Sequence, residues 1–207
     1  MKVAIIGAGN VGKALGTSLG RAGHEVTITG STPESGATAA REIGAQSADT
    51  NVAAVTGADI VILAVPYTSS GEQVATEIAD ATAGRVVIDA TNPIRADYSG
   101  LATNGTSGAE EFQKRLPAAT VIKAFNTVFA ANQADPTASA EPIDGYVAGD
   151  DAEAKQKVIS LVESIGMQPL DVGPLRAART LEAMAYLNIG LNAANGWGWT
   201  SAWRLER

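Results

Sequence analysis

Few residues in this chain could carry acid–base or nucleophilic chemistry. Its 207 residues include one histidine and no cysteine, which excludes thiolate nucleophiles, disulfides and multi-histidine metal sites. His24 lies in the turn before the second predicted strand, at the end of the sheet opposite the expected cofactor. We therefore favour a structural role for it. Lys123 is a candidate proton donor or the partner of a carboxylate, and Asp89 is a candidate buried acid or orienting group. We therefore predict no metal site and assign no certain catalytic residue.

A glycine-rich turn is the most specific feature of the sequence. A buried strand, Val3–Ile6, runs into this turn and an amphipathic helix, Val11–Ala22, leads out of it. The turn consists of Gly7, Ala8, Gly9, Asn10, Val11 and Gly12. Between a strand and a helix, this glycine spacing is typical of dinucleotide binding, because it lets a pyrophosphate approach the backbone at the helix N-terminus. The alternative is that the glycines only make a tight turn.

The end of the second predicted strand indicates which dinucleotide binds. An NAD-binding chain would place Asp or Glu there, roughly 20 residues past the glycine turn. Here the strand Val26–Thr29 ends in Gly30-Ser31-Thr32, with no acid at the tip. The Ser31 and Thr32 hydroxyls could bind a 2′-phosphate, so NADP is favoured over NAD. The alternative is that they only cap the helix that opens at Pro33.

The residues expected to meet a nicotinamide ring are polar but mostly not titratable near neutral pH. They follow three strands, at Pro66-Tyr67-Thr68, Thr91-Asn92-Pro93 and Lys123-Ala124-Phe125-Asn126-Thr127. A hydride donor without an acid–base pair suits flavin or deazaflavin acceptors, whose rings take up the charge themselves. Catalysis would then rest on aligning two rings. The alternatives are a reductase of a small carbonyl or imine and a nonenzymatic NADP(H) sensor.

Short apolar runs alternate with helical patterns, which predicts an α/β fold with a Rossmann-type, doubly wound parallel sheet. The predicted strands are Val3–Ile6, Val26–Thr29, Ala45–Ala48, Asp59–Val65, Arg85–Ala90, Thr120–Phe125, Gly145–Gly149 and Gln168–Val172. The predicted helices are Val11–Ala22, Pro33–Ile43, Val52–Thr56, Ser70–Thr82, Ala109–Leu116, Ala152–Ile165 and Leu175–Asn195, with polar loops at 96–108 and 134–142. We expect a single domain over residues 1–207. Its dinucleotide-binding core is 1–133, and its small C-terminal α/β extension, 134–207, ends in the long helix.

Charge and hydropathy limit the partners. The net charge of −7 argues against nucleic acid or an anionic membrane surface. No apolar stretch approaches the roughly 20 residues of a membrane span. The first residues form a strand and lack the pattern of a signal peptide, so we expect a cytoplasmic protein.

Over nearly its whole length the chain resembles the NADPH-dependent coenzyme F420 reductase family (F420H2:NADP oxidoreductases). It is also similar to the cytosolic oxidoreductase domain of the six-transmembrane ferric reductases. The likeness rests on Ile6–Gly12, Gly30-Ser31, Ala64-Val65-Pro66-Tyr67, Lys123–Thr127, Ala148-Gly149-Asp150-Asp151 and Pro169–Leu175. In the family, the last helix and the tail complete the fold and help to form dimers, so the resemblance implies a homodimer built through the C-terminal region.

The resemblance also implies site residues and a hydride acceptor. NADP contacts on the pyrophosphate and 2′-phosphate side would come from Ala8, Gly9, Asn10, Val11, Ser31 and Thr32. Contacts on the nicotinamide side would come from Val65, Tyr67, Asn92 and Ala130, together with Pro66, which ends the same strand as Val65. The acceptor, coenzyme F420 or a flavin such as FMN or FAD, would lie near Asn126, Val128 and the aromatic tail.

The chain departs from the family pattern at two positions. Thr32 stands where the family usually has arginine, and Asn126 stands where the F420 reductases proper have histidine. The first departure leaves the strictness of the NADP preference open, and the second leaves the acceptor open. The tail tryptophans Trp197, Trp199 and Trp203 could stack on a flat ring or pack in a dimer interface.

Overall fold

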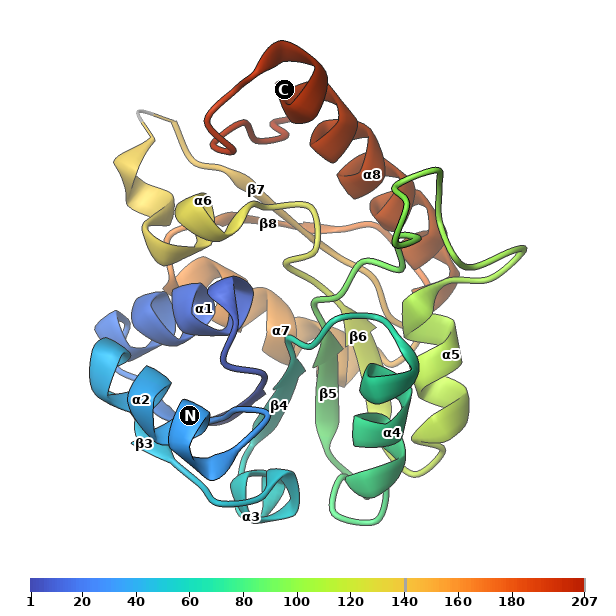
Figure 1. Cartoon of the computed structure of the whole chain (residues 1–207). Helices are drawn as coiled ribbons and strands as arrows, with labels where there is room; N and C mark the ends of the chain where they lie inside the picture. Colours follow the sequence, from blue (N-terminus) through green and yellow to red (C-terminus); the bar gives the residue numbers. More distant parts are fainter. Residues whose placement is uncertain (140, 207) are drawn as a thin grey trace.

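A twisted parallel sheet of six strands forms the centre of the molecule (Figure 1). The computed structural model describes residues 1–139 and 141–206. Strand order is β3-β2-β1-β4-β5-β6, so the order reverses between β1 and β4, where doubly wound folds bind their ligands. The strands are β1 (Lys2–Ile6), β2 (Glu25–Thr29), β3 (Gln46–Ser47), β4 (Ile60–Leu63), β5 (Val86–Asp89) and β6 (Thr120–Lys123).

Helices cover both faces of this sheet. The α-helices are α1 (Asn10–Arg21), α2 (Pro33–Ile43), α3 (Asn51–Val55), α4 (Ser69–Glu77), α5 (Gly108–Arg115), α6 (Ala130–Ala134), α7 (Ala152–Ser164) and α8 (Ala178–Asn195). Two short 3₁₀ helices lie at Pro136–Ala138 and Leu175–Ala177. Within the described part of the chain, no helix is both long enough and apolar enough to cross a membrane.

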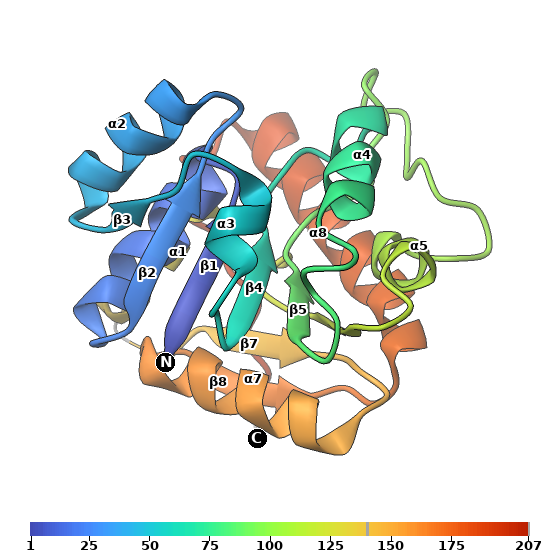
Figure 2. The same ribbon diagram turned by 90° about the horizontal axis from the view of Figure 1, so that it is seen from below.

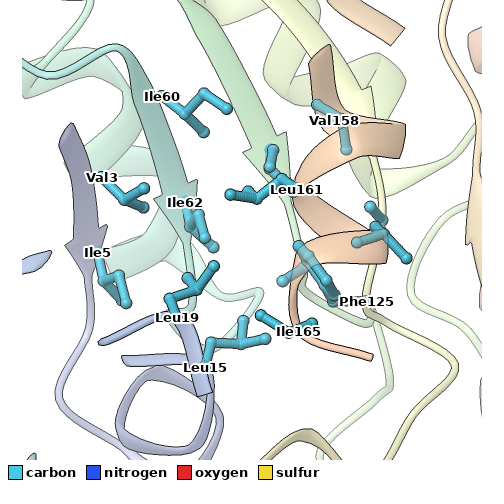
Figure 3. Close-up of a cluster of buried hydrophobic side chains, with 14 of the residues drawn as sticks. Val3, Ile5, Leu15, Leu19, Ile60, Ile62, Phe125, Val158, Leu161 and Ile165 are labelled. Carbon is cyan, nitrogen blue, oxygen red and sulfur yellow. The ribbon is translucent and has the colours of Figure 1, made fainter. Parts of the chain in front are cut away.

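Two apolar layers hold the sheet between its helices. In one layer, β1 and β4 pack against α1 and α7 through side chains that are nearly inaccessible to solvent. Figure 3 shows Val3, Ile5, Leu15, Leu19, Ile60, Ile62, Phe125, Val158, Leu161 and Ile165 converging there. The other layer packs the opposite face of the sheet against α3, α4, α5 and the start of α8. Strands buried on both faces explain the continuous apolar runs of the sequence.

The C-terminal part adds a second, smaller parallel sheet of β7 (Asp144–Val147) and β8 (Gln168–Asp171). The helix α7 connects these two strands and lies across the main sheet (Figure 2). An antiparallel bridge between Lys123 and Ala148 joins the two sheets, with N–O distances of 2.8 and 3.0 Å. The helix α8 then crosses above the carboxyl ends of the strands (Figure 1).

The predicted fold class is confirmed, and a few element boundaries differ from prediction. The helix predicted over 70–82 ends at Glu77, where tighter three-residue turns, such as that from Ala79 N to Thr76 O, follow. The helix predicted from Leu175 begins with a 3₁₀ turn. The helix α6 and the 3₁₀ helix after it were not predicted. Residue 140, within the loop predicted over 134–142, lies outside the described residues. The boundary at 133/134 stays a prediction.

Candidate functional site

The three glycines of the turn have different local requirements. Gly7 has φ = 121°, and a Cβ there would collide with the carbonyl oxygen of Ala64. A Cβ on Gly12 would collide with the carbonyl oxygen of Gly7. Gly9 differs, because a Cβ there would meet no protein atom within 4 Å and its φ of −76° is open to any residue. The protein itself does not need glycine at position 9, so the open space there is suited to a bound group.

A first hollow of about 730 Å³ lies on one side of the glycine turn. Its walls come from the ends of β1, β2 and β4 and from the start of α4. Below it, Thr29 donates to Asn51 Oδ1 at 2.7 Å, and Asn51 donates to Glu77 Oε2 at 3.0 Å. The first hollow is lined by Ile6, Gly7, Ala8, Gly9, Gly30, Ser31, Ser35, Asn51, Ala64, Val65, Pro66, Ser70, Gly71, Gln73, Val74 and Glu77.

The tip of β2 has a defined role in helix capping. Thr32 Oγ1 accepts from Ser35 N at 3.2 Å, and Ser35 Oγ accepts from Thr32 N at 3.1 Å, so the two side chains form a capping box for α2. Ser31 lines the first hollow, whereas Thr32 lines a shallow hollow beside it together with Lys13. Lys13 pairs with Glu42 at 3.0 Å.

A second hollow of about 780 Å³ lies on the other side of the turn. It is lined by Asn10, Val11, Ala90, Asn92, Tyr98, Phe125, Asn126, Thr127, Val128, Phe129, Ala130, Ala131, Gln133, Ala185, Asn188, Ile189 and Trp199. Two of these residues are joined by a pair of hydrogen bonds. Asn126 Nδ2 donates to Asn92 Oδ1 and Asn92 Nδ2 donates to Asn126 O, both at 2.9 Å. Phe125 has φ = 67°, a left-handed conformation that is rare outside glycine.

The chain after α8 folds back over the second hollow. The rings of Phe129 and Trp199 meet edge to face, with centroids 5.5 Å apart. Asn132 Nδ2 donates to Thr200 O at 2.8 Å, and Ser201 donates to Asn188 Oδ1 at 2.7 Å. These contacts fix the tail against both α6 and α8, so that Trp199 forms part of the wall of the hollow.

A fully buried ionic cluster lies behind the strand ends. Lys123 Nζ lies 2.8 Å from Asp89 Oδ2, 2.9 Å from Glu182 Oε1 and 2.7 Å from Thr91 O, and all three charged side chains are inaccessible to solvent. These contacts use all three ammonium donors, so Lys123 is the partner of carboxylates rather than a free proton donor. Burial raises the pKa of Glu182, and Lys123 partly opposes that rise.

The structure distributes the predicted site residues unevenly. The first hollow gathers Gly7, Ala8, Gly9, Ser31, Val65 and Pro66, and the second gathers Asn10, Val11, Asn92, Asn126, Val128 and Ala130. Val65 and Pro66 thus lie apart from the other residues predicted on the nicotinamide side. Gly12 is buried under the turn.

Tyr67 lines neither of the two main hollows. It packs edge to face on Phe112, with centroids 5.5 Å apart, and burial together with the charges of Glu72 and Glu111 raises its pKa to about 12. His24 lies at the opposite end of the sheet, where its Nε2 atom is 2.9 Å from Ser164 Oγ, and burial lowers its pKa. Neither side chain therefore faces the second hollow.

Several lining residues were missed by sequence reasoning. The helix α8 contributes Ala185, Asn188 and Ile189 to the second hollow. Their spacing of three and four residues, with asparagine on the buried face of a helix, was a usable signal. Phe129, which precedes the short helix α6, and Gln133 within it carried no such signal, because that helix is little more than a single turn.

Comparisons with known proteins place the chain in a family. Residues 2–93 match the family model described as NADP oxidoreductase coenzyme F420-dependent. The F420-dependent NADP reductase of Methanothermobacter marburgensis is 33% identical over 94% of this chain and 94% of its own length. The chain belongs to this family. A structure of a candidate F420-dependent NADP reductase from Arthrobacter sp. FB24 superposes with a TM-score of 0.88, at 28% identity, over 100% of both chains.

A second group of relatives is longer. The metalloreductase STEAP3 of Rattus norvegicus is 31% identical over 88% of this chain but only 36% of its own length. The chain thus spans about a third of that protein. Membership of the F420-dependent family therefore rests on relatives that the chain covers almost from end to end.

Proposed function

We propose that the protein is an NADP-dependent oxidoreductase that transfers a hydride between NADP(H) and a deazaflavin or flavin-like acceptor. The observation that carries the proposal is the composition of the second hollow. Among the described residues that line it, none is Asp, Glu, His, Lys or Arg, and amide and apolar side chains predominate. Tyr98, whose side chain is exposed, is the described lining residue that carries a phenolic hydroxyl. Without a charged acid–base pair, such a wall chiefly aligns and stacks rings, which suits an acceptor whose own ring takes up the charge.

The open space at Gly9 supports the fit of a dinucleotide. The adenosine half would lie in the first hollow and the nicotinamide half in the second, with the pyrophosphate passing Gly9 at the N-terminus of α1. The bound nicotinamide would supply the hydride. Asn92 and Asn126, held by their mutual hydrogen bonds, would orient the ring, and the tail with Trp199 would exclude water.

The proposal also specifies the nucleotide, NADP, and the class of hydride acceptor. NADP rather than NAD is supported by the absence of an acid at the tip of β2, where Gly30, Ser31 and Thr32 stand. Coenzyme F420 as the partner of NADP(H) is supported by the F420-dependent NADP reductases that match over most of the chain. FMN and FAD are proposed alternatives with the same flat ring chemistry.

Mixing the pure protein with NADPH and one acceptor at a time tests the proposal. The acceptors are F420, FMN, FAD and a panel of small carbonyls and imines, and the readout is loss of the nicotinamide absorbance band. Oxidation with F420 or a flavin alone is expected. Oxidation with a carbonyl or imine alone would refute the proposal, and tight NADPH binding without turnover on any acceptor would indicate a sensor.

We also propose a homodimer formed through the C-terminal region, and a cytoplasmic location. Leu187, Leu191 and Trp197 expose apolar surface along and after α8, and a second copy could cover it. Sedimentation of the wild type and of Leu187→Asp tests the dimer: the wild type should sediment as a dimer and the variant as a monomer. Cell fractionation tests the location.

A further inference from the structure

The buried cluster connects parts of the chain that are far apart in sequence. Lys123 in β6 reaches Asp89 in β5, 34 residues earlier, and Glu182 in α8, 59 residues later. Its third contact is the carbonyl oxygen of Thr91, at 2.7 Å. One ammonium group therefore joins two strands of the sheet to the helix that crosses above them.

The residues that Lys123 contacts are neighbours in sequence, or through a hydrogen bond, of residues that line the second hollow. Ala90 and Asn92, on either side of Thr91, both line the hollow. Asn126, also in the lining, donates to Leu181 O at 3.1 Å, next to Glu182. The following turn of α8 presents Ala185, Asn188 and Ile189 to the same space.

Glu182 also holds the start of α5. Its two carboxylate oxygens lie 2.9 and 3.1 Å from the backbone nitrogen of Gly108. All the ionic groups of the cluster are fully buried, and a buried ion triad is often no more stabilising than apolar side chains of the same volume. Stability alone therefore does not account for the cluster. Holding α8 in a fixed position over the strand ends accounts for it.

We propose that Lys123 is a positioning residue, whose ammonium group holds the end of β5 and the helix α8 in one arrangement so that Asn92, Asn126 and α8 form a fixed wall for the nicotinamide half of the dinucleotide. Lys123 acts through these neighbours and does not touch the ring. The inference rests on the proposed function, because it requires the nicotinamide to lie in the second hollow.

Two ligands allow the two halves of the binding site to be tested independently. Adenosine 2′,5′-bisphosphate probes the first hollow alone, and NADPH probes both hollows. For Lys123→Met we expect the NADPH Kd to rise about tenfold or more, because small misplacements weaken oriented contacts. The Kd of adenosine 2′,5′-bisphosphate should not change. Lys155→Met is the matched control, since it removes another paired lysine, 3.0 Å from Asp171, that lines neither hollow, and it should bind both ligands like the wild type.

Lys123→Met leaves two buried carboxylates without a partner, so folding needs its own control. The triple variant Asp89→Asn/Lys123→Met/Glu182→Gln has no charge in the cluster and nearly the same volume, and should melt close to the wild type. It should still lose NADPH affinity selectively. Equal loss for both ligands, no loss for either, or a triple variant that does not fold would each overturn the proposal. A wild type that binds the bisphosphate but not NADPH would instead refute the proposed function.

Discussion

The ring of Trp199 stands edge-on to the ring of Phe129, with centroids 5.5 Å apart and planes at 87°. Both residues line the second hollow and come from distant parts of the chain, one from the tail after α8 and the other from the residue before α6. Their contact makes the tail part of the site rather than a loose end. Substitutions of Trp199 and Trp197 should therefore affect the site differently, because Trp199 lines the hollow and Trp197 does not.

Trp199→Leu should raise the KM for the flavin or F420 acceptor. Aromatic pairs contribute about 0.5–1.5 kcal/mol beyond their buried area, so a rise of about two- to tenfold is expected. Trp197→Leu is the matched control, since both side chains are 47% exposed and only Trp199 lines the hollow. Steady-state kinetics with varied acceptor measures both. An equal effect of the two substitutions would contradict an acceptor role for Trp199.

Gly9→Ala should fold normally and bind NADPH weakly. Because no protein atom lies within 4 Å of the added Cβ, the melting temperature should not change. The methyl group would occupy the path of the pyrophosphate, which predicts a rise in Kd of at least about tenfold. Gly20→Ala, in an equally open position of α1, should gain up to about 1 kcal/mol of stability and bind NADPH unchanged. Fluorescence titration distinguishes the two variants.

Thr32→Arg should tighten NADPH binding relative to NADH. The substitution removes the N-cap of α2, at a cost of about 1 kcal/mol in unfolding free energy, and adds a guanidinium group for a 2′-phosphate. Thr32→Ala provides the control, because it loses the same cap without adding charge. If NADPH and NADH tighten equally in the arginine variant, the 2′-phosphate lies elsewhere.

Glu182 and Glu110 should contribute opposite pH dependences to stability. The pKa of Glu182 is raised by burial, so the folded chain binds more protons there than the unfolded chain and the contribution of Glu182 falls as pH rises above its ordinary value of 4.5. The pKa of Glu110 is lowered, chiefly by its hydrogen bond to Arg179, so its contribution is lost as pH falls through the lowered value. Thermal melts from acid to neutral pH should show a flatter profile above pH 4.5 for Glu182→Gln, and less acid sensitivity for Glu110→Gln. Profiles identical to the wild type would contradict these assignments.

The sequence predicted the fold well because local patterns encode it. Continuous apolar strands, the glycine turn and caps such as Asp151, which accepts from Ala154 N at 2.8 Å, all act within a few residues. The short helix α6 was missed because its five residues are too few to show a helical period, and its packing against α1 cannot be seen in the sequence.

Sequence reasoning named residues of both hollows, but it missed the wall that α8 contributes to the second. The first hollow is built by the glycine turn and by strand ends, whose positions follow from the strand order. The second hollow also depends on where α8 and the tail lie in the fold. The spacing of Ala185, Asn188 and Ile189 indicates a buried helix face but not what that face packs against. The partnership of Lys123 with a carboxylate was one of two alternatives, and its second carboxylate, Glu182, carried no signal across 59 residues.

The buried cluster also implies an order of assembly during synthesis of the chain. The sheet from β1 to β6 contains both Asp89 and Lys123, so its interior is charge-balanced as soon as residue 123 is in place. Glu182 belongs to a segment made much later and brings the surplus carboxylate. The growing chain can therefore close its main sheet without waiting for α8. The helix α8 is therefore not needed to balance charge within the sheet, and its contribution to the cluster is to complete the wall of the second hollow.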